Sequence, residues 1–92
     1  MHGVVVTVDI EGEIEEVLKM LDEFTIPRAK SLEGFVRGVW IRSSDGSQGQ
    51  SIVLFDSEEH AQAAAEVIRQ GPPPGAPISL RSAEVFEVVR EA

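Results

Sequence analysis

The sequence predicts an α+β domain: an antiparallel four-stranded sheet with both helices on one face, followed along the chain in the order β-α-β-β-α-β. Two observations support this. First, β-branched runs alternate with stretches of helical periodicity. Second, the halves resemble each other, because Val5–Asp9 and Ile52–Asp56 each end in an aspartate before a helix. We take residues 1–92 as a single domain with one modest core.

Each predicted strand is apolar on both of its faces, which a strand with one wet face would not be. Val4, Val6 and Val8 lie on one side of the first strand and Val5 on the other. Two helices can cover only one face, and the other would expose about 400 Å², as large as the apolar patches that monomers tolerate. The pattern therefore predicts a homodimer that forms through the sheet faces.

The first half begins with a strand over residues 3–10 and a helix from about Glu13. Apolar residues at three- and four-residue spacing give the helix one inward stripe: Ile14, Val17, Leu18, Leu21 and Phe24. Pro27 is expected to kink or break this helix. Residues 29–32 add a further turn, which ends at Gly34.

A hairpin follows, with strands over residues 35–42 and 50–56 joined by a tight primed turn at Asp45-Gly46. The expected pairs are Val36–Phe55, Gly38–Val53, Val39–Ile52 and Trp40–Ser51. This register places Phe35 on the same face as Arg37, unless a bulge at Gly49 shifts it by one residue.

The second helix is expected to be capped by Asp56 or Ser57. Its inward stripe consists of Ala61, Ala64, Ala65 and Ile68, small residues that either let helix and sheet approach or leave room between them. Residues 71–75 form a stiff proline-rich spacer, or alternatively a polyproline ligand. The last strand is expected over residues 83–89.

The composition argues against several kinds of partner. The net charge is −8 and the basic residues are scattered, so neither nucleic acid nor an anionic membrane is expected as a partner. Cysteine is absent, and His2 and His60 do not form a metal-binding spacing, so no metal or cofactor is expected. No leader or membrane span is recognisable, which favours a cytoplasmic location.

The chain resembles the dimeric α+β barrel superfamily, particularly the antibiotic-biosynthesis-monooxygenase-like (ABM-like) proteins. Four segments carry the resemblance: Pro27 with Ala29-Lys30, residues 33–36, the Asp45-Gly46 hairpin, and residues 55–59 before an alanine-rich helix. It implies a ferredoxin-like protomer whose sheet stacks on that of a partner. Activities in this superfamily range from oxidation of aromatics and haem degradation to ligand sensing, so the fold alone does not select one.

The resemblance also implies what this chain does not do. The haem-degrading members use an asparagine on the first strand, a tryptophan on the second helix and a histidine shortly after it. This sequence has no asparagine, carries Ala63–Ala65 where that tryptophan would fall, and has no histidine after His60. Haem degradation is therefore not expected.

Arg37, Trp40 and Ala64 are the candidate ligand-binding residues. Arg37 is charged among apolar strand neighbours, so its guanidinium would clamp a carboxylate or phenolate if that face meets the helices. Otherwise it pairs with Glu84 or Glu87, within the chain or across the dimer. Trp40 is suited to lining an aromatic-binding pocket, or alternatively to the core or the dimer interface.

Possible catalytic residues are His60 and Arg37. The helix N-terminus beside His60 disfavours its charged form, which suits a general base, although the sequence places no carboxylate to orient it. An ordinary surface histidine is the alternative. The leading functional hypothesis is a small dimer that binds an apolar or aromatic ligand with an acidic group. The alternatives are a cofactor-independent monooxygenase or cyclase with Trp40, Arg37 and His60 in its site, and a structural dimer without a ligand.

Overall fold

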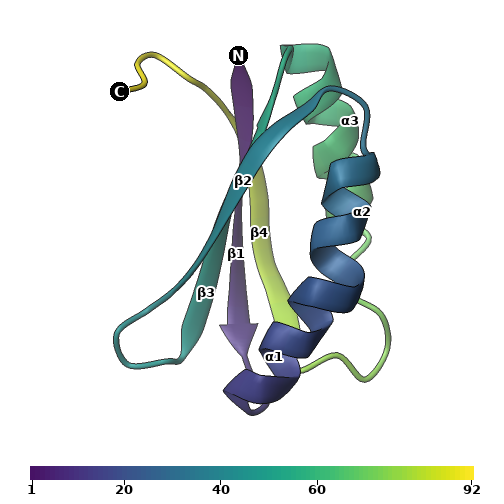
Figure 1. Cartoon of the computed structure of the whole chain (residues 1–92), viewed down its shortest axis with the longest axis vertical. Helices are drawn as coiled ribbons and strands as arrows, with labels where there is room; N and C mark the ends of the chain where they lie inside the picture. The colour runs from purple at the N-terminus through teal and green to yellow at the C-terminus, as the bar shows by residue number, and fades with distance from the viewer.

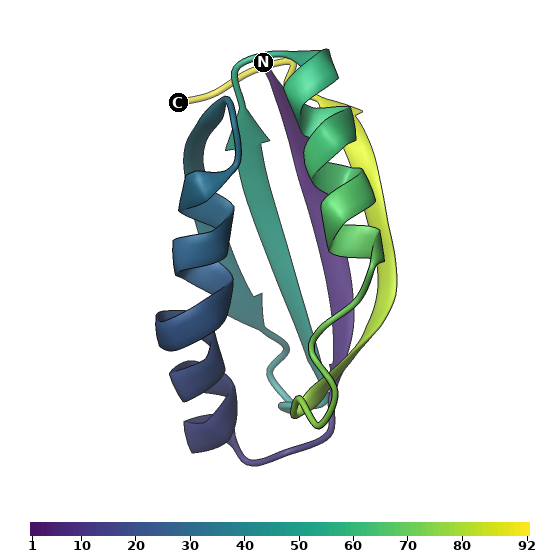
Figure 2. The ribbon, with the colours of Figure 1, turned by 90° about the vertical axis from the view of Figure 1, so that its right-hand side faces the viewer.

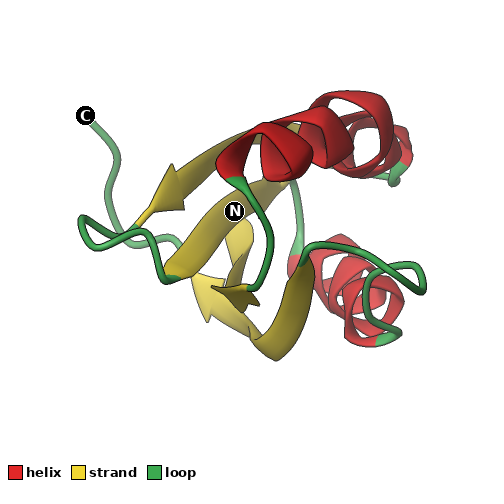
Figure 3. Ribbon diagram, turned by 90° about the horizontal axis from the view of Figure 1, so that it is seen from below, coloured by secondary structure: helices red, strands yellow, loops and turns green.

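The computed structural model describes all residues, 1–92, and confirms the predicted architecture. Its elements are β1 (His2–Ile10), α1 (Ile14–Met20), η1 (Leu21–Thr25), α2 (Ile26–Ser31), β2 (Phe35–Arg42), β3 (Gln48–Phe55), α3 (Glu58–Arg69) and β4 (Ile78–Glu87). The strands form one sheet in the order β2-β3-β1-β4, and neighbours are antiparallel throughout. All helices lie on one face of this sheet, and the other face carries none (Figures 1 and 3).

The core lies between α3 and the centre of the sheet. Ala61, Ala64 and Ala65 of α3 are buried against Val4 of β1 and Phe55 of β3, both 0% exposed. Alanine side chains let a helix approach a sheet closely, so the alanine stripe of α3 packs on the sheet and does not leave room between them. The hydroxyl of Ser57 accepts a hydrogen bond from the His60 amide at 3.1 Å and caps the helix, whereas Asp56 does not.

The prediction that Pro27 kinks or breaks the first helix holds in part: the chain stays helical through Pro27, but the regular α-helix is interrupted immediately before it. α1, η1 and α2 follow one another without a gap over residues 14–31, as one coil beside α3 (Figure 2). The segment just before Pro27 is a π-helix, in which the Ile26 amide bonds the Leu21 carbonyl, five residues back. Proline in a helix lacks an amide and clashes with the carbonyl four residues before it. A wider turn at that point accommodates both defects.

The hairpin keeps the predicted register near its turn but not at its far end. Trp40 pairs with Ser51 and Val39 with Ile52, as predicted. Phe55 pairs with Phe35 rather than Val36, because the register shifts between Phe35 and Arg37. Phe35 therefore packs against the helix-side core, edge-to-face with Phe55 at 6.4 Å between ring centroids. The ladder is regular at Gly49, which pairs with Arg42.

The turn itself differs from the predicted primed type. Both primed turn types need positive φ at the first central residue, here Asp45, but in this turn only Gly46 has it, at 78°. The Gly46 amide instead bonds the Ser43 carbonyl, which makes Ser44 and Asp45 the central residues. Asp45 accepts hydrogen bonds from the Ser47 amide and from the Ser47 and Ser43 hydroxyls, and these lower the pKa of its carboxyl to about 2. The connection between the two strands is longer than predicted, but it is still centred on Asp45-Gly46, so the strands keep the predicted register next to the turn.

The last strand spans Ile78–Glu87 rather than residues 83–89. It starts directly after the proline-rich loop and runs the full length of β1. A register shift next to Thr7 leaves Arg81 without a partner residue on β1. The Arg81 guanidinium forms an ion pair with the Asp9 carboxylate at 3.4 Å. The early part of this strand escaped the sequence analysis because Ser79, Arg81 and Ser82 interrupt its apolar pattern.

The helix-free face of the sheet is apolar at its centre. We call this the open face. Ile52, Val39, Ile41 and Phe86 are between 43% and 54% exposed there. Val5 lies between Ile52 and Glu84 in one row, and Gly3 between Leu54 and Phe86 in the next. The sheet thus carries apolar residues on both of its faces, as the sequence predicted.

Candidate functional site

A cavity of about 230 Å³ lies between the first helix, α3 and the sheet. Its helical wall comes from α1, η1 and α2, and its floor from the helix-side residues of β1 and β3. Ile68 of α3 and Pro72 of the following loop close the opposite side. Of the lining residues, 18 of 27 are hydrophobic, so the cavity is suited to an apolar molecule.

The cavity exists because the two helices approach the sheet differently. α3 presents alanines to β1 and packs tightly, while the first helix presents large side chains, among them Leu21 and Phe24. Figure 2 shows the two helices side by side along the sheet, with β3 and β1 visible between them. Phe24 remains 39% exposed although it belongs to the apolar stripe of its helix. The first helix therefore covers its part of the sheet incompletely.

Two residues of the hairpin give the cavity a distinct chemical character. Trp40 packs against the edge of the core and turns toward the cavity from β2. Its partner Ser51 is a floor residue of β3 and only 7% exposed. An indole ring beside a buried hydroxyl offers a stacking surface and one hydrogen-bonding group, the combination that small-molecule pockets use for affinity and orientation.

The only charged residues that line the cavity are Arg28 of α2 and Arg42 at the end of β2. Arg28 is half-buried, and its guanidinium carbon lies 5.5 Å from the centroid of the Phe24 ring. Neither arginine forms a salt bridge within the chain. The sequence analysis did not single out either residue. The signal for Arg28 was available, since it follows Phe24 by one helical turn on the inward stripe.

The predicted ligand-binding residues do not gather at this cavity. Trp40 lines it, but Ala64 is 2% exposed inside the α3 core and does not. Arg37 lies on the open face, opposite to Trp40, because its pairing partner Leu54 points there. Its guanidinium is 3.2 Å from the Glu91 carboxylate, so its partner is the C-terminal tail and neither Glu84 nor Glu87.

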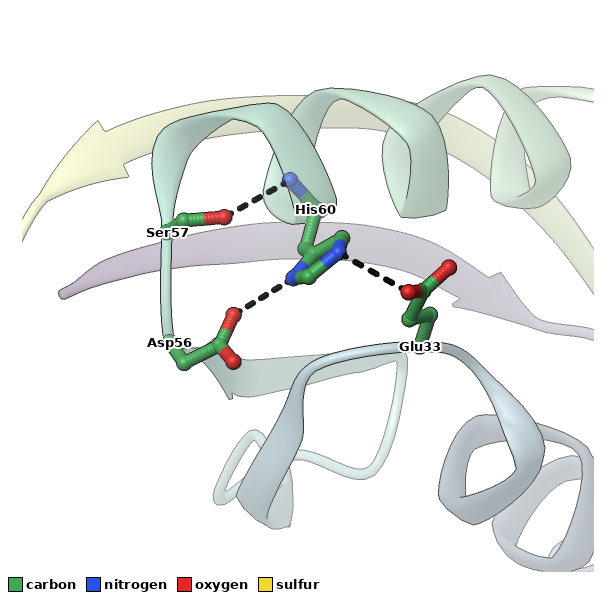
Figure 4. Close-up of polar contacts among 4 residues, drawn as sticks. All are labelled: Glu33, Asp56, Ser57 and His60. Carbon is green, nitrogen blue, oxygen red and sulfur yellow. Dashed lines mark hydrogen bonds and ion pairs between the residues drawn. The ribbon is translucent and has the colours of Figure 1, made fainter.

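His60 occupies a separate corner, where the first turn of α3 meets the connection between α2 and β2 (Figure 4). Its Nδ1 is 2.6 Å from Asp56 Oδ1, and its Nε2 is 3.5 Å from Glu33 Oε1. The expectation that no carboxylate orients it is therefore wrong. Asp56 was detectable, since it precedes His60 by four residues, but Glu33 comes close only through the tertiary fold.

The electrostatics of this corner also differ from the expectation. The hydrogen bond that His60 Nδ1 donates to the Asp56 carboxylate raises the pKa of His60, and the negative charges of Asp56 and Glu33 add to that rise. The same hydrogen bond lowers the pKa of Asp56. The helix N-terminus was expected to favour neutral imidazole, but a carboxylate in contact outweighs a partial charge. His60 does not line the cavity, so His60, Arg37 and Trp40 do not converge on one site.

Four solved structures resemble this fold over nearly the whole chain. A dimeric ferredoxin-like protein from an uncultured marine organism is 21% identical, with a TM-score of 0.64, and covers 100% of this chain and 98% of its own. A mutant of MhuD with two manganese protoporphyrin IX molecules bound per active site is 18% identical, with a TM-score of 0.67 and the same coverage.

Two further neighbours are described as monooxygenases. The ActVA-Orf6 monooxygenase of Streptomyces coelicolor, in complex with nanaomycin D, is 16% identical, with a TM-score of 0.59, over 99% of this chain and 88% of its own. A putative monooxygenase from Shewanella loihica PV-4 is 16% identical, with a TM-score of 0.56, and 99% of each chain is covered.

Comparisons of the sequence alone add nothing to these structural matches. No family model and no curated protein matches the chain. None of the helices is long and apolar enough to cross a membrane. At identities of 16% to 21%, the four neighbours establish the fold but not an activity. The protein has a ferredoxin-like fold, which these four neighbours share.

Proposed function

We propose that this protein binds a small, largely apolar and aromatic molecule in the cavity between the helices and the sheet. The observation that carries the proposal is the cavity itself, about 230 Å³ with mostly apolar walls. Trp40 supplies a stacking surface and Ser51 a hydroxyl for orientation. Two of the structural neighbours were solved with organic ligands bound, which supports a binding role for this fold.

The proposal includes a homodimer that forms through the open face. Ile52, Val39, Ile41 and Phe86 would otherwise leave a contiguous apolar surface in water. One of the neighbours is a dimeric ferredoxin-like protein. Stacking two open faces leaves the helices of both copies outside, so each protomer keeps its own cavity.

The experiment uses a neutral fluorescent probe, N-phenylnaphthylamine, whose emission rises in apolar surroundings. The single tryptophan, Trp40, lines the cavity and provides a second signal by energy transfer to the probe. The test variant is Ala29→Leu, because Ala29 is a buried lining residue of α2. The matched control is Ala63→Leu, the same change at an exposed position of α3.

We expect saturable binding to wild type and to Ala63→Leu, and at least about tenfold weaker binding to Ala29→Leu, since overpacking removes the space that the ring system needs. Val8→Phe fills the cavity from the floor and guards against a local effect of the first variant. Absence of binding to the wild type, or equal affinity in all variants, would contradict the proposal and favour a structural dimer without a ligand site.

The geometry does not favour the catalytic alternative in the form that the sequence suggested. A monooxygenase or cyclase built on Trp40, Arg37 and His60 needs all three beside one substrate. Arg37 lies on the open face and His60 at the far corner, and neither lines the cavity. Binding requires only the cavity, so binding is the function that we propose.

A further inference from the structure

We infer that the ligand of this cavity is an anion and that Arg28 contacts its acidic group. This inference rests on the proposed binding function and adds the charge class of the ligand. The ligand would be an aromatic or apolar molecule with a carboxylate or another ionised acid at one end. That group would face the α2 side of the cavity, and the ring system would lie toward Trp40.

The charge distribution around the cavity is the first argument. The chain has sixteen Asp and Glu residues against eight Lys and Arg, for a net charge of −8. None of the sixteen lines the cavity, although Asp22 and Glu23 belong to the same helical wall and are exposed on it. The two charged lining residues are both arginines. The cavity is thus locally positive in an acidic protein, and a local field of this kind selects ligands by charge.

The second argument is that Arg28 has no ion-pair partner within the chain. Three of the other five arginines form ion pairs, Arg37 with Glu91, Arg69 with Glu66 and Arg81 with Asp9, and the remaining two, Arg42 and Arg90, are exposed to solvent. Arg28 has no such partner, although it is half-buried and held over the ring of Phe24. A guanidinium fixed by stacking keeps its edge free, and that edge matches the two oxygens of a carboxylate.

Arg42 has a lesser role. It is exposed at the hairpin end of β2, where it lines both the cavity and a small neighbouring hollow with Ser43 and Gln48. Its charge adds to the positive field at that end, but solvent screens it. We therefore assign the contact to Arg28 alone, and expect Arg42→Met to have a smaller effect than Arg28→Met.

The test compares two probes that differ by one charged group: neutral N-phenylnaphthylamine and its sulfonate, anilinonaphthalene sulfonate. The quantity measured is the ratio of their dissociation constants for each variant. Arg28→Met removes the guanidinium and keeps an apolar stem. Lys30→Met is the charge-matched control, because Lys30 lies on the same helix, is exposed and does not line the cavity. Arg28→Lys keeps the positive charge but lacks the guanidinium edge that can donate two parallel hydrogen bonds.

We expect Arg28→Met to weaken binding of the sulfonate about tenfold and to leave the neutral probe within about twofold of wild type. Lys30→Met should leave the ratio of the two dissociation constants unchanged. The ratio for Arg28→Lys should lie between those of wild type and Arg28→Met. An unchanged ratio in Arg28→Met, with the neutral probe still bound, would overturn the anion inference and leave the proposed function standing. Failure of the neutral probe to bind wild type would overturn both.

Discussion

The imidazole of His60 and the carboxylate of Asp56 are in contact at 2.6 Å, and this pair lies where the start of α3 meets the connection between α2 and β2. Asp56 directly follows β3, and His60 lies in the first turn of α3. The Asp56 amide also bonds the Gly34 carbonyl at 2.9 Å. Two segments that are distant in the sequence, the α2–β2 connection and the junction between β3 and α3, therefore meet at this pair, as Figure 4 shows for Glu33, Asp56 and His60.

The pair makes stability depend on pH in a definite direction. The pKa of His60 is raised above its ordinary value of 6.5, so its contribution is complete below that value and is lost as pH rises through the folded pKa. The pKa of Asp56 is lowered from 3.8, so its contribution is lost as pH falls through the folded value. The pair is therefore strongest between these two ordinary values.

We expect Asp56→Asn to lower the pKa of His60, measured by NMR titration of the imidazole. As pH rises above 6.5 and passes through the raised pKa of His60, the free energy of unfolding should fall more steeply in wild type than in His60→Gln. Equal slopes in both proteins, or an unchanged His60 pKa in Asp56→Asn, would show that the pair does not form in solution.

Gly34 should be intolerant of any side chain. Its φ is +82°, and a Cβ there would overlap the His60 ring and the Asp56 carboxylate. Gly46 has nearly the same conformation, φ +78°, but a Cβ there meets nothing within 4 Å. Gly46→Ala should therefore cost about 1 kcal/mol of stability from backbone strain alone, and Gly34→Ala should cost about 1 to 3 kcal/mol more from overpacking.

Chemical denaturation of the two glycine variants measures this difference directly. On a His60→Ala background the excess cost of Gly34→Ala should shrink, because the overlapping ring is gone. If both glycine variants lose the same stability, the close packing of this corner is not present in solution.

Ile52→Glu should convert the dimer to a monomer. Ile52 is 43% exposed at the centre of the open face, between Val5 and Val39. A carboxylate there would be buried without a partner in the dimer. Sedimentation velocity should show a dimer for wild type and for Ala63→Glu, which makes the matched change on the outer side of α3. A wild-type monomer at micromolar concentration would refute the dimer.

Arg37→Met should leave both probes bound as in wild type. The Arg37 side chain is 60% exposed on the open face, where it pairs with Glu91, and an exposed pair of this kind contributes at most about 1 kcal/mol to stability. Titration with the neutral probe and the sulfonate measures the effect. A clear loss of sulfonate binding in Arg37→Met, but none in Arg28→Met, would return the acid-binding role to Arg37 and contradict the face assignment.

The sequence was sufficient to predict the order of elements and the two apolar faces, because both depend on local periodicity. It was not sufficient to say which face meets the helices. The choice of face determines that Trp40 lines the cavity and that Arg37 does not. The two residues lie three positions apart on β2 and belong to opposite faces. The register of Trp40 against Ser51 followed from the turn. The shift at Phe35 did not, because it depends on the packing of Phe35 against Phe55.

The candidate site was predictable only in part. Trp40 could be identified from the sequence as a possible lining residue. The cavity could not, since it results from unequal approach of two helices to one sheet, and that is a property of packing rather than of pattern. Arg28 and Asp56 had helical-spacing signals that were available but not used. Glu33 reaches His60 across a turn that no local pattern describes.

Methyl NMR distinguishes ligand binding on the helix side of the sheet, which we propose, from binding on the open face. Val53 and Ile52 are adjacent on β3 but point to opposite faces: Val53 lines the cavity, and Ile52 lies on the open face. With bound N-phenylnaphthylamine, we expect intermolecular NOEs from the Val53 and Val8 methyl groups and none from Ile52 or Val39. NOEs confined to Ile52 and Val39 would place the ligand on the open face and contradict the account.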